Sequence, residues 1–314
     1  MKKGYLYIAL STTLFSTMEI ALKLFSIGYD PMQINFIRFL IGSMLLFPHS
    51  LKILKSRNIR LHTGDIRFFA LTGFLCVVVS MTLYQFAVIR TDASVVAILV
   101  CCNPVFAILF AFVLLREKIR KTDILSVVVS MIGILCVMNP LKIGTASRSG
   151  IVLSILTAVT FALYGVVGKL RVEKYGSIVL CFFSFLMGCL ELLMLIFISR
   201  VSVVSSALDA AGLSKFADIP ILKGITLQNL PGIAYLGIFV TGLGYTFYFL
   251  AMETTSVSKA SLIFFIKIAL APVLALLFLH ESITMNILFG IAFIIIGSGI
   301  TFFPQGKSEK QPLR

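Results

Sequence analysis

The chain has 314 residues, of which 59% are hydrophobic and only 13% are charged. Long apolar runs separated by short polar segments exclude a soluble globular domain and are typical of a polytopic membrane protein. The formal net charge of +14 would suggest nucleic-acid binding in a soluble protein, but in a membrane protein the position of the cations matters more than their sum.

Ten apolar runs follow one another, each near the length of about 20 residues that a helix needs to cross a bilayer. The first run follows lysines as a signal peptide would, but it has no small-x-small cleavage site and contains Glu19 and Lys23, so we expect a retained span. The predicted spans are Tyr5 to Ile27, Met32 to Ser50, Arg67 to Ile89, Ser94 to Leu115, Asp123 to Met138, Gly150 to Leu170, Ser177 to Ser199, Pro231 to Met252, Ser258 to His280 and Met285 to Phe303.

Lysine and arginine residues are concentrated in alternate connecting segments. They cluster at residues 52–60, 116–121, 171–174 and 307–314, whereas the intervening segments hold fewer. The positive-inside rule therefore places both termini in the cytoplasm, and we expect a multi-pass protein of the cell (inner) membrane. The long segment from Arg200 to Leu230 then becomes an external loop, with an interfacial helix near Ala207 to Phe216.

Two sets of matching residues indicate an internal repeat. At a spacing of 146 residues (182 − 36), the first set aligns Phe36, Phe39, Leu40 and Gly42 with Phe182, Phe185, Leu186 and Gly188. At a spacing of 164 residues (248 − 84), the second set aligns Tyr84, Ala87, Ser94, Glu117 and Gly133 with Tyr248, Ala251, Ser258, Glu281 and Gly297. Because each half holds an odd number of spans, the second half must enter the membrane from the opposite side.

The repeat predicts an all-α integral membrane protein of ten transmembrane helices, arranged as two inverted five-helix repeats. We place the first repeat at residues 1–140, the second at residues 150–304 and a cytoplasmic tail at residues 305–314. Inverted repeats of this kind build secondary transporters, whose substrate site lies near the bilayer midplane between the halves.

Three long segments carry a family pattern: GYLYIALSTTLFSTMEIALKLF, NPVFAILFAFVLLREKI and SKASLIFFIKIALAPVLALLFLHESI. In the last two, a proline is followed by a glutamate, Pro104 by Glu117 and Pro272 by Glu281. The chain resembles the EamA-like family of the drug/metabolite transporter superfamily over nearly its whole length. The resemblance implies a ten-span fold around a central cavity, with spans 5 and 10 at the periphery, and export or exchange of small metabolites. Lys267 departs from the pattern, because many relatives carry an uncharged residue there.

Five ionisable residues are candidates for a site within the membrane, where a charge at the centre of a lone span costs about 2.5–3.5 kcal/mol. Glu19 and Lys23 lie one helical turn apart, and Arg38 lies at a similar depth on the next span. We expect these three to meet, either as an ion-pair cluster that orients the first two spans or as a gating or substrate group. Glu191 and Lys267 each lie about 14 Å from a span end, so we expect them to form an ion pair or to line the substrate cavity.

Two uncharged residues complete the candidate site. Asn103 is the repeat counterpart of Lys267 (267 − 164), so an inverted two-fold axis brings both to a similar depth. Tyr164 is a second candidate, for which an ordinary interhelical hydrogen bond is the competing interpretation. The candidate substrate-binding residues are Lys267, Glu191, Asn103, Glu19, Arg38 and Tyr164.

The sequence predicts a secondary-active exporter or exchanger of small polar metabolites such as amino acids. The six cysteines lie in apolar runs without a CxxC pair, His280 and Glu281 are not part of an HExxH motif, and no Walker motif occurs. We therefore expect no enzyme activity, metal, cofactor or nucleic-acid partner. A channel or a lipid-carrier flippase of the same fold is the alternative.

The energy source and the substrate chemistry follow from the same charged residues. If transport is coupled to protons, Glu191 is the expected carrier, because Lys23 and Arg38 would keep Glu19 ionised. Lys267 is the expected partner of an anionic group on the substrate.

Overall fold

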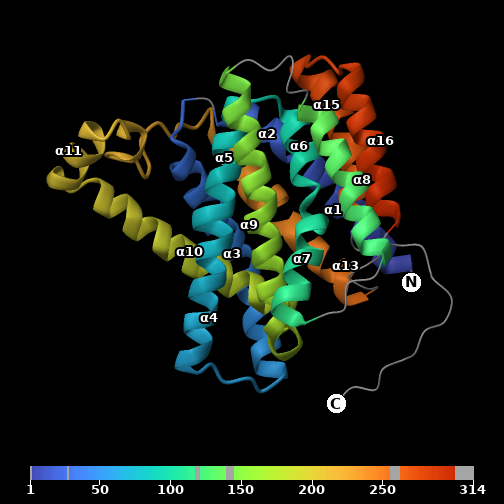
Figure 1. Ribbon diagram of the computed structural model, residues 1–314. Coiled ribbons are helices and arrows are strands. Elements are labelled where there is room, and N and C mark those ends of the chain that lie inside the picture. The colour runs from blue at the N-terminus through green and yellow to red at the C-terminus, as the bar shows by residue number, and fades with distance from the viewer. Residues whose placement is uncertain (1, 27, 117–120, 139–144, 255–261, 301–314) are drawn as a thin grey trace.

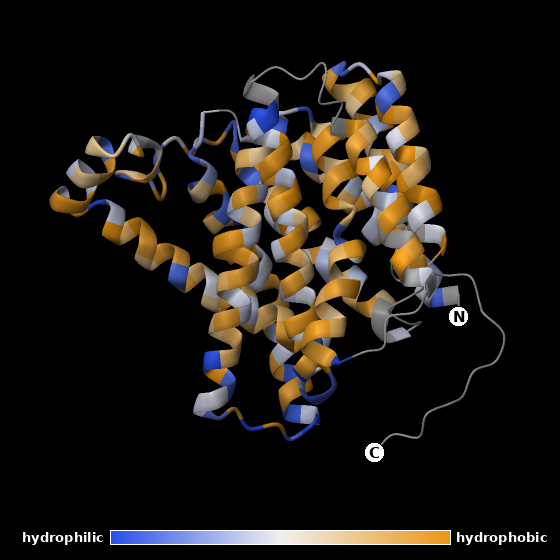
Figure 2. Cartoon of the chain, viewed as in Figure 1, coloured by the Kyte–Doolittle hydropathy of each residue, from blue (hydrophilic) through white to orange (hydrophobic). Residues whose placement is uncertain are grey.

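The computed structural model describes residues 2–26, 28–116, 121–138, 145–254 and 262–300, which form a bundle of helices (Figure 1). Among these residues, the helices long and apolar enough to cross a membrane are Lys3–Phe25, Pro31–Ser56, Thr63–Arg90, Ala93–Leu115, Arg148–Tyr175, Ser177–Ser199 and Leu230–Ala251. Shorter apolar helices cover Val128–Val137, Ile266–Leu279 and Met285–Gly297. Hydrophobic residues dominate the middle of the bundle and hydrophilic residues gather at its ends (Figure 2). The chain is an all-helical membrane protein.

Several spans in the first half are interrupted helices. The elements are α1 (Lys2–Ser16), α2 (Met18–Phe25), α3 (Pro31–Ser56), α4 (Thr63–Gly73), the π-helical segment η1 (Phe74–Ser80), α5 (Met81–Arg90), α6 (Ala93–Val100), α7 (Asn103–Leu115) and α8 (Lys121–Met138). The first span breaks at Thr17, whose hydroxyl is 2.7 Å from the Tyr235 hydroxyl of the second half.

The second half repeats this arrangement after a longer connecting segment. Its elements are α9 (Thr145–Tyr175), α10 (Ser177–Ser199), α11 (Ser202–Ala210), the 3₁₀ turn η2 (Ser214–Phe216), α12 (Leu230–Ala234), the π-helical segment η3 (Tyr235–Leu243), α13 (Gly244–Thr254), α15 (Leu262–Leu279) and α16 (Met285–Ile300). The helix after α10 therefore begins several residues before the predicted Ala207 to Phe216. Glu117, Ser258 and the predicted tail at residues 305–314 lie outside the described residues.

One glycine allows an abrupt connection between two spans. Gly176, with φ of +79°, is the single residue between α9 and α10. Glycine adopts this backbone conformation without a steric penalty, whereas other residues do not. The chain can therefore turn sharply here, so that α10 starts immediately after α9. Figure 1 shows α10 leaning away from the bundle toward α11.

A π-helical segment interrupts a span in each half, and the two segments overlap under the 164-residue spacing. Each packs against the other half through a glycine. A Cβ added at Gly42 on α3 would lie 2.9 Å from Thr241 of η3, and one added at Gly188 on α10 would lie 2.6 Å from Val77 of η1. Gly42 and Gly188 are themselves repeat counterparts. The same close approach therefore occurs twice, with the halves exchanged.

The last span of each half packs against its counterpart, α8 along α16. A Cβ added at Gly133 of α8 would lie 2.9 Å from the carbonyl oxygen of Gly290 of α16. Small residues allow such close packing inside a membrane, where van der Waals contact replaces the hydrophobic effect as the driving force between helices.

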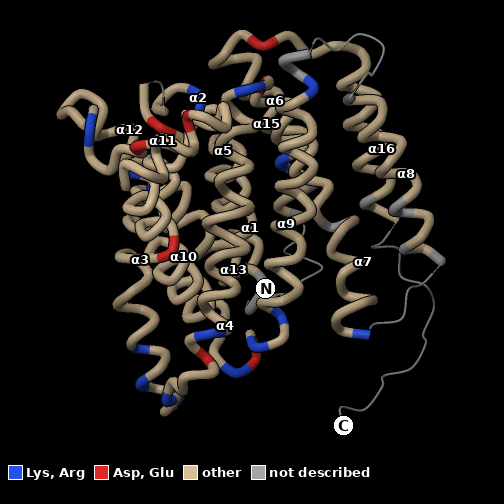
Figure 3. Tube along the Cα trace, turned by 60° about the vertical axis from the view of Figure 1, so that its left-hand side comes forward, with Lys and Arg blue, Asp and Glu red and all other residues tan. Residues whose placement is uncertain are grey.

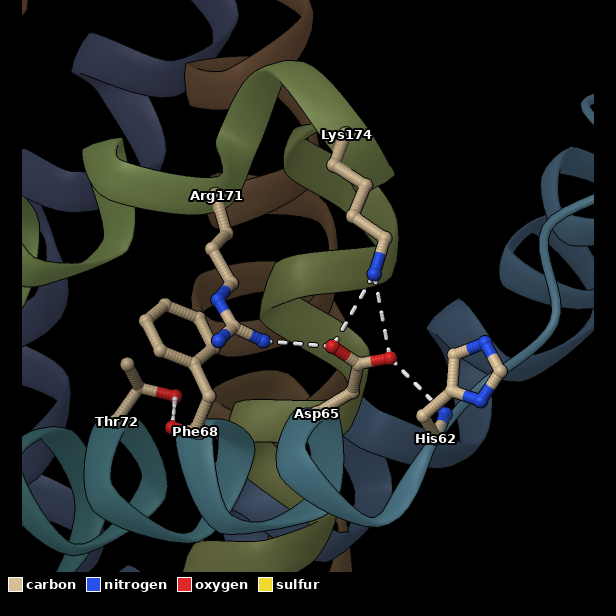
Figure 4. A network of polar contacts seen from close by, with 6 residues as sticks. All are labelled: His62, Asp65, Phe68, Thr72, Arg171 and Lys174. Atoms are coloured by element: carbon tan, nitrogen blue, oxygen red, sulfur yellow. Dashed lines mark hydrogen bonds and ion pairs between the residues drawn. The ribbon is translucent and has the colours of Figure 1, made fainter.

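A buried carboxylate, Asp65, joins the start of α4 to the end of α9 at one end of the bundle. Asp65 accepts a hydrogen bond from the His62 amide at 3.0 Å, and it pairs with Arg171 at 2.6 Å and Lys174 at 3.2 Å near the end of α9 (Figure 4). The network therefore fixes α4 to α9 at this end.

We predict that Gly188→Ala destabilises the protein by about 1–3 kcal/mol, because the new methyl group would overlap the Val77 side chain and the Gly73 carbonyl oxygen at 2.7 Å. Thermal unfolding in detergent measures the effect. Gly165→Ala is the matched control, since a Cβ at Gly165 meets no atom within 4 Å. Equal stability of the Gly188 variant and wild type would contradict the tight packing between α10 and η1.

Candidate functional site

The centre of the bundle contains an ion pair between the two halves. Glu19 lies in the first turn of α2, the second of the two helices that form the first span, and Lys267 lies on α15. Lys267 Nζ is 2.6 Å from Glu19 Oε1, and the side chains are 3% and 1% exposed. The contact is an ion pair by distance, although neither oxygen of Glu19 accepts a hydrogen bond of standard geometry from the described residues. Removing one partner would leave an uncompensated buried charge.

Arg38 is a second buried cation, and it lies on α3 with no exposed surface. Its Nε and Nη2 donate to Asn35 Oδ1 at 3.3 and 3.1 Å, and Nη1 contacts Met18 Sδ at 3.8 Å. The guanidinium carbon lies 4.7 Å from the centre of the Phe39 ring. Within the described part of the chain, no carboxylate lies within 4 Å of it. Arg38 is therefore held by neutral groups.

Several buried polar atoms of the core have no hydrogen-bond partner among the described residues. They include the hydroxyls of Ser16, Tyr84 and Thr241 and both side-chain polar atoms of Gln85. Tyr84 faces Glu19 and Arg38, and Tyr245 also lies near Arg38. Buried polar groups are normally satisfied, so these atoms keep unused hydrogen-bonding capacity inside the bundle.

The expected cluster of Glu19, Lys23 and Arg38 is wrong in its Lys23 member, whereas Arg38 does lie near Glu19. Glu19 instead pairs with Lys267, and Lys23 reaches the end of its span, where its Nζ lies 2.9 Å from Glu281 Oε1 and 3.8 Å from Asp92 Oδ1. Glu19 and Lys23 lie one turn apart on the same helix, but their side chains do not pair. Lys267 of α15 pairs with Glu19, and Glu281, which follows α15, pairs with Lys23.

Glu281 also caps the start of α6. Its Oε1 accepts from the Ala93 amide at 2.8 Å, and its Oε2 accepts from the Ser94 amide and hydroxyl at 3.0 and 2.8 Å. A carboxylate is favourable here because unsatisfied amides and the helix dipole make a helix N-terminus positive. Lys23, Glu281 and α6 together tie this end of the bundle, opposite to the Asp65 network.

The expected ion pair between Glu191 and Lys267 is also wrong, because Lys267 is paired with Glu19. Glu191 lies on α10, which packs on α3, α4 and η1, whereas α15 packs on α1, α2 and α6. Similar depth therefore did not bring the two side chains to the same interface. Glu191 is half-buried, and its Oε2 has no hydrogen-bond partner among the described residues.

The two uncharged candidates, Asn103 and Tyr164, are both buried in the core. Asn103 is 8% exposed and begins α7, just after a helix break at Cys101 and Cys102, and the Cys101 thiol lies near Lys267 and Glu19. Tyr164 is 4% exposed, and its hydroxyl is 3.7 Å from Cys181 Sγ. Tyr164 is also near Tyr245, so it belongs to the Arg38 side of the core.

Sequence reasoning missed Asn35 and Tyr245. Asn35 lies three residues before Arg38, a spacing that puts both on one helix face, so it could have been found by asking which neutral group satisfies the arginine. Tyr245 had no such signal, because its proximity to Arg38 depends on how α13 packs.

Two segments of the chain, residues 2–139 and 148–303, each match the EamA-like transporter family. An uncharacterized transporter of Clostridium kluyveri is 40% identical, with 98% of this chain and 96% of that protein covered. Protein PecM of Dickeya dadantii is 28% identical over 78% of this chain and 77% of its own length. A structure described only as "Crystal structure of protein" has a TM-score of 0.65 at 15% identity, covering 96% of this chain and 97% of that chain. This last likeness concerns the fold alone.

We predict that Lys267→Met destabilises the protein by about 3–5 kcal/mol, because Glu19 would be left buried without its partner. The double variant Glu19→Gln/Lys267→Met should recover most of this loss, since it removes both charges. Unfolding of the wild type, both single variants and the double variant forms a double-mutant cycle. Lys52→Met, at an exposed lysine, is the control, and additive effects in the cycle would show that the pair contributes no coupling.

We predict that the stability provided by Glu281 is lost in acid. Burial alone would raise the pKa of its carboxyl, but hydrogen bonds from Lys23, Ser94 and Ala93 hold the pKa below its ordinary value of 4.5. A lowered pKa in the folded state stabilises the protein above the ordinary pKa, and the contribution disappears as the pH falls through the folded-state pKa.

The measurement is the melting temperature of wild type and Glu281→Gln from neutral pH to about pH 3. Their difference should stay constant above about pH 4.5 and shrink below it. Glu173→Gln, at an exposed glutamate, should show no comparable difference. A gap between wild type and Glu281→Gln that is independent of pH would contradict the capping role.

Proposed function

This chain belongs to the EamA-like transporter family, and we propose that it is a secondary-active exporter or exchanger of small polar metabolites, such as amino acids, across the cytoplasmic membrane. It is a transporter and not an enzyme. The observation that carries the proposal is the set of buried charges between the two halves, where Glu19 of the first half pairs with Lys267 of the second and Arg38 lies near Glu19. Charged groups inside a membrane bundle mark substrate and ion pathways.

We propose ten spans in two inverted repeats, with both termini in the cytoplasm. The seven long and three shorter apolar helices of the described residues support the span count. The exchanged contacts of Gly42 with η3 and Gly188 with η1 support the inversion. Lys and Arg residues gather where α3 ends and α4 begins (Figure 3), which supports a cytoplasmic position for that end.

Substrate would bind at the central charges, and the ionic contacts at the two ends would close the path to them. Lys23 and Glu281 tie one end, and Asp65 with Arg171 ties the other. Alternating access would break one of these contacts while the other remains. In this proposal, Asn103 and Tyr164 would add neutral hydrogen-bonding groups to the substrate site.

Proton coupling is part of the proposal, with Glu191 as the proton carrier. Glu19 is paired with a cation, whereas Glu191 has no ion-pair partner among the described residues. A partly exposed carboxylate in a span can exchange its proton without breaking an ion pair. Glu191→Gln should therefore abolish the dependence of transport on a proton gradient while counterflow persists.

The function is tested by saturable counterflow of labelled amino acids and related metabolites in proteoliposomes containing the purified protein. We expect uptake against internal unlabelled substrate, with protein-free liposomes as the control. Non-saturable conductance would identify a channel, and movement of lipid-linked molecules without soluble metabolites would identify a flippase. Either result would reject the carrier.

A further inference from the structure

We propose that Arg38 and Asn35 form an anion subsite, which binds one carboxylate group of the transported molecule. This inference rests on the proposed transport function and assigns the chemical class that its central site recognises. It also assigns the anion to Arg38 in place of Lys267.

Charge balance favours Arg38. Lys267 is neutralised by Glu19 at 2.6 Å, so the three central charges leave one positive charge without a counterpart. Arg38 remains protonated under all ordinary conditions, and an uncompensated ion in an apolar interior costs several kcal/mol. An anionic ligand would offset that cost, whereas binding at Lys267 would first require separating an existing ion pair.

The guanidinium is held in a fixed orientation before any ligand arrives. Asn35 Oδ1 accepts from two of its nitrogens, while Asn35 Nδ2 donates to the Val77 carbonyl at 2.8 Å and to the Thr82 hydroxyl at 3.2 Å. The Phe39 ring packs against the guanidinium. Among the described residues, the one hydrogen-bond acceptor within reach of Nη1 is the sulfur of Met18 at 3.8 Å, which is a weak acceptor. Donors on Nη1 therefore remain available to a stronger acceptor.

The surroundings favour an anion of single charge. Tyr84 supplies a buried hydroxyl that lies near both Arg38 and Glu19. One carboxylate would bring the central charges to neutrality. A dianion such as sulfate would leave an excess negative charge close to Glu19, so it should bind less well.

The test measures binding independently of transport. The melting temperature of the purified protein is followed as acetate or sulfate replaces chloride at constant ionic strength. We expect a saturable rise with acetate and a smaller one with sulfate. Arg38→Gln should weaken the apparent acetate affinity by about tenfold or more, because a charge-assisted hydrogen bond is lost. Arg60→Gln, the same substitution at an exposed site, should behave as wild type.

Two further variants separate an anion subsite from a merely structural arginine. Arg38→Lys keeps the charge without the planar fork, so it should retain part of the acetate response. Asn35→Asp places an internal carboxylate against Arg38 and should remove the acetate response although the arginine is intact. Both variants keep the proposal testable if Arg38→Gln does not fold.

The inference is overturned if acetate does not stabilise the wild type, if Arg38→Gln and Asn35→Asp respond as wild type does, or if sulfate stabilises more than acetate. Loss of the response in Lys267→Met with an intact response in Arg38→Gln would move the site to Lys267 and also overturn it. An intact acetate response in a protein that gives no counterflow would count against the transport function alone.

Discussion

Buried charge is the constraint on which the arrangement of this bundle depends. An apolar interior does not tolerate a lone carboxylate or ammonium, so Glu19 in the first span requires a cation from elsewhere. Lys267 supplies it from α15 at 2.6 Å. The pair links the two halves of the chain and fixes how the first span faces the second half. Arg38 then remains as the cation that neutral groups hold.

Packing and site chemistry meet at the π-helical segments. The glycines Gly42 and Gly188 allow η3 and η1 to approach the opposite half closely. In η1, the Val77 carbonyl accepts a hydrogen bond from Asn35, which in turn holds Arg38. Such π-helical interruptions occur frequently at functional sites. Here the interruption provides a backbone acceptor beside a buried cation, so the same segment serves both packing and electrostatics.

The central and terminal ionic contacts differ in their access to water. Glu19 and Lys267 are 1% and 3% exposed, whereas Lys23 and Arg171 are 26% and 39% exposed. Water competes for partly exposed pairs and makes them weak, while a broken buried pair is costly. At each end the cation can therefore exchange its partner for water, whereas the carboxylates, Glu281 at 8% and Asp65 at 4% exposed, depend on their backbone hydrogen bonds when the cation leaves.

The sequence alone determined the class of protein, the family and the approximate positions of the spans, because these depend on local hydrophobic length and on residues close together in the chain. It also identified Glu19, Arg38 and Lys267 as charges that needed partners. It did not determine the partners. Helical spacing suggested Lys23 as the partner of Glu19, and estimated depth suggested Glu191 as the partner of Lys267. Neither the spacing nor the depth shows which faces of distant helices meet. Only the packing of α15 against α2, and of α10 against α3 and η1, decided those contacts, because an ion pair depends on angstrom-scale distances between side chains from separate spans.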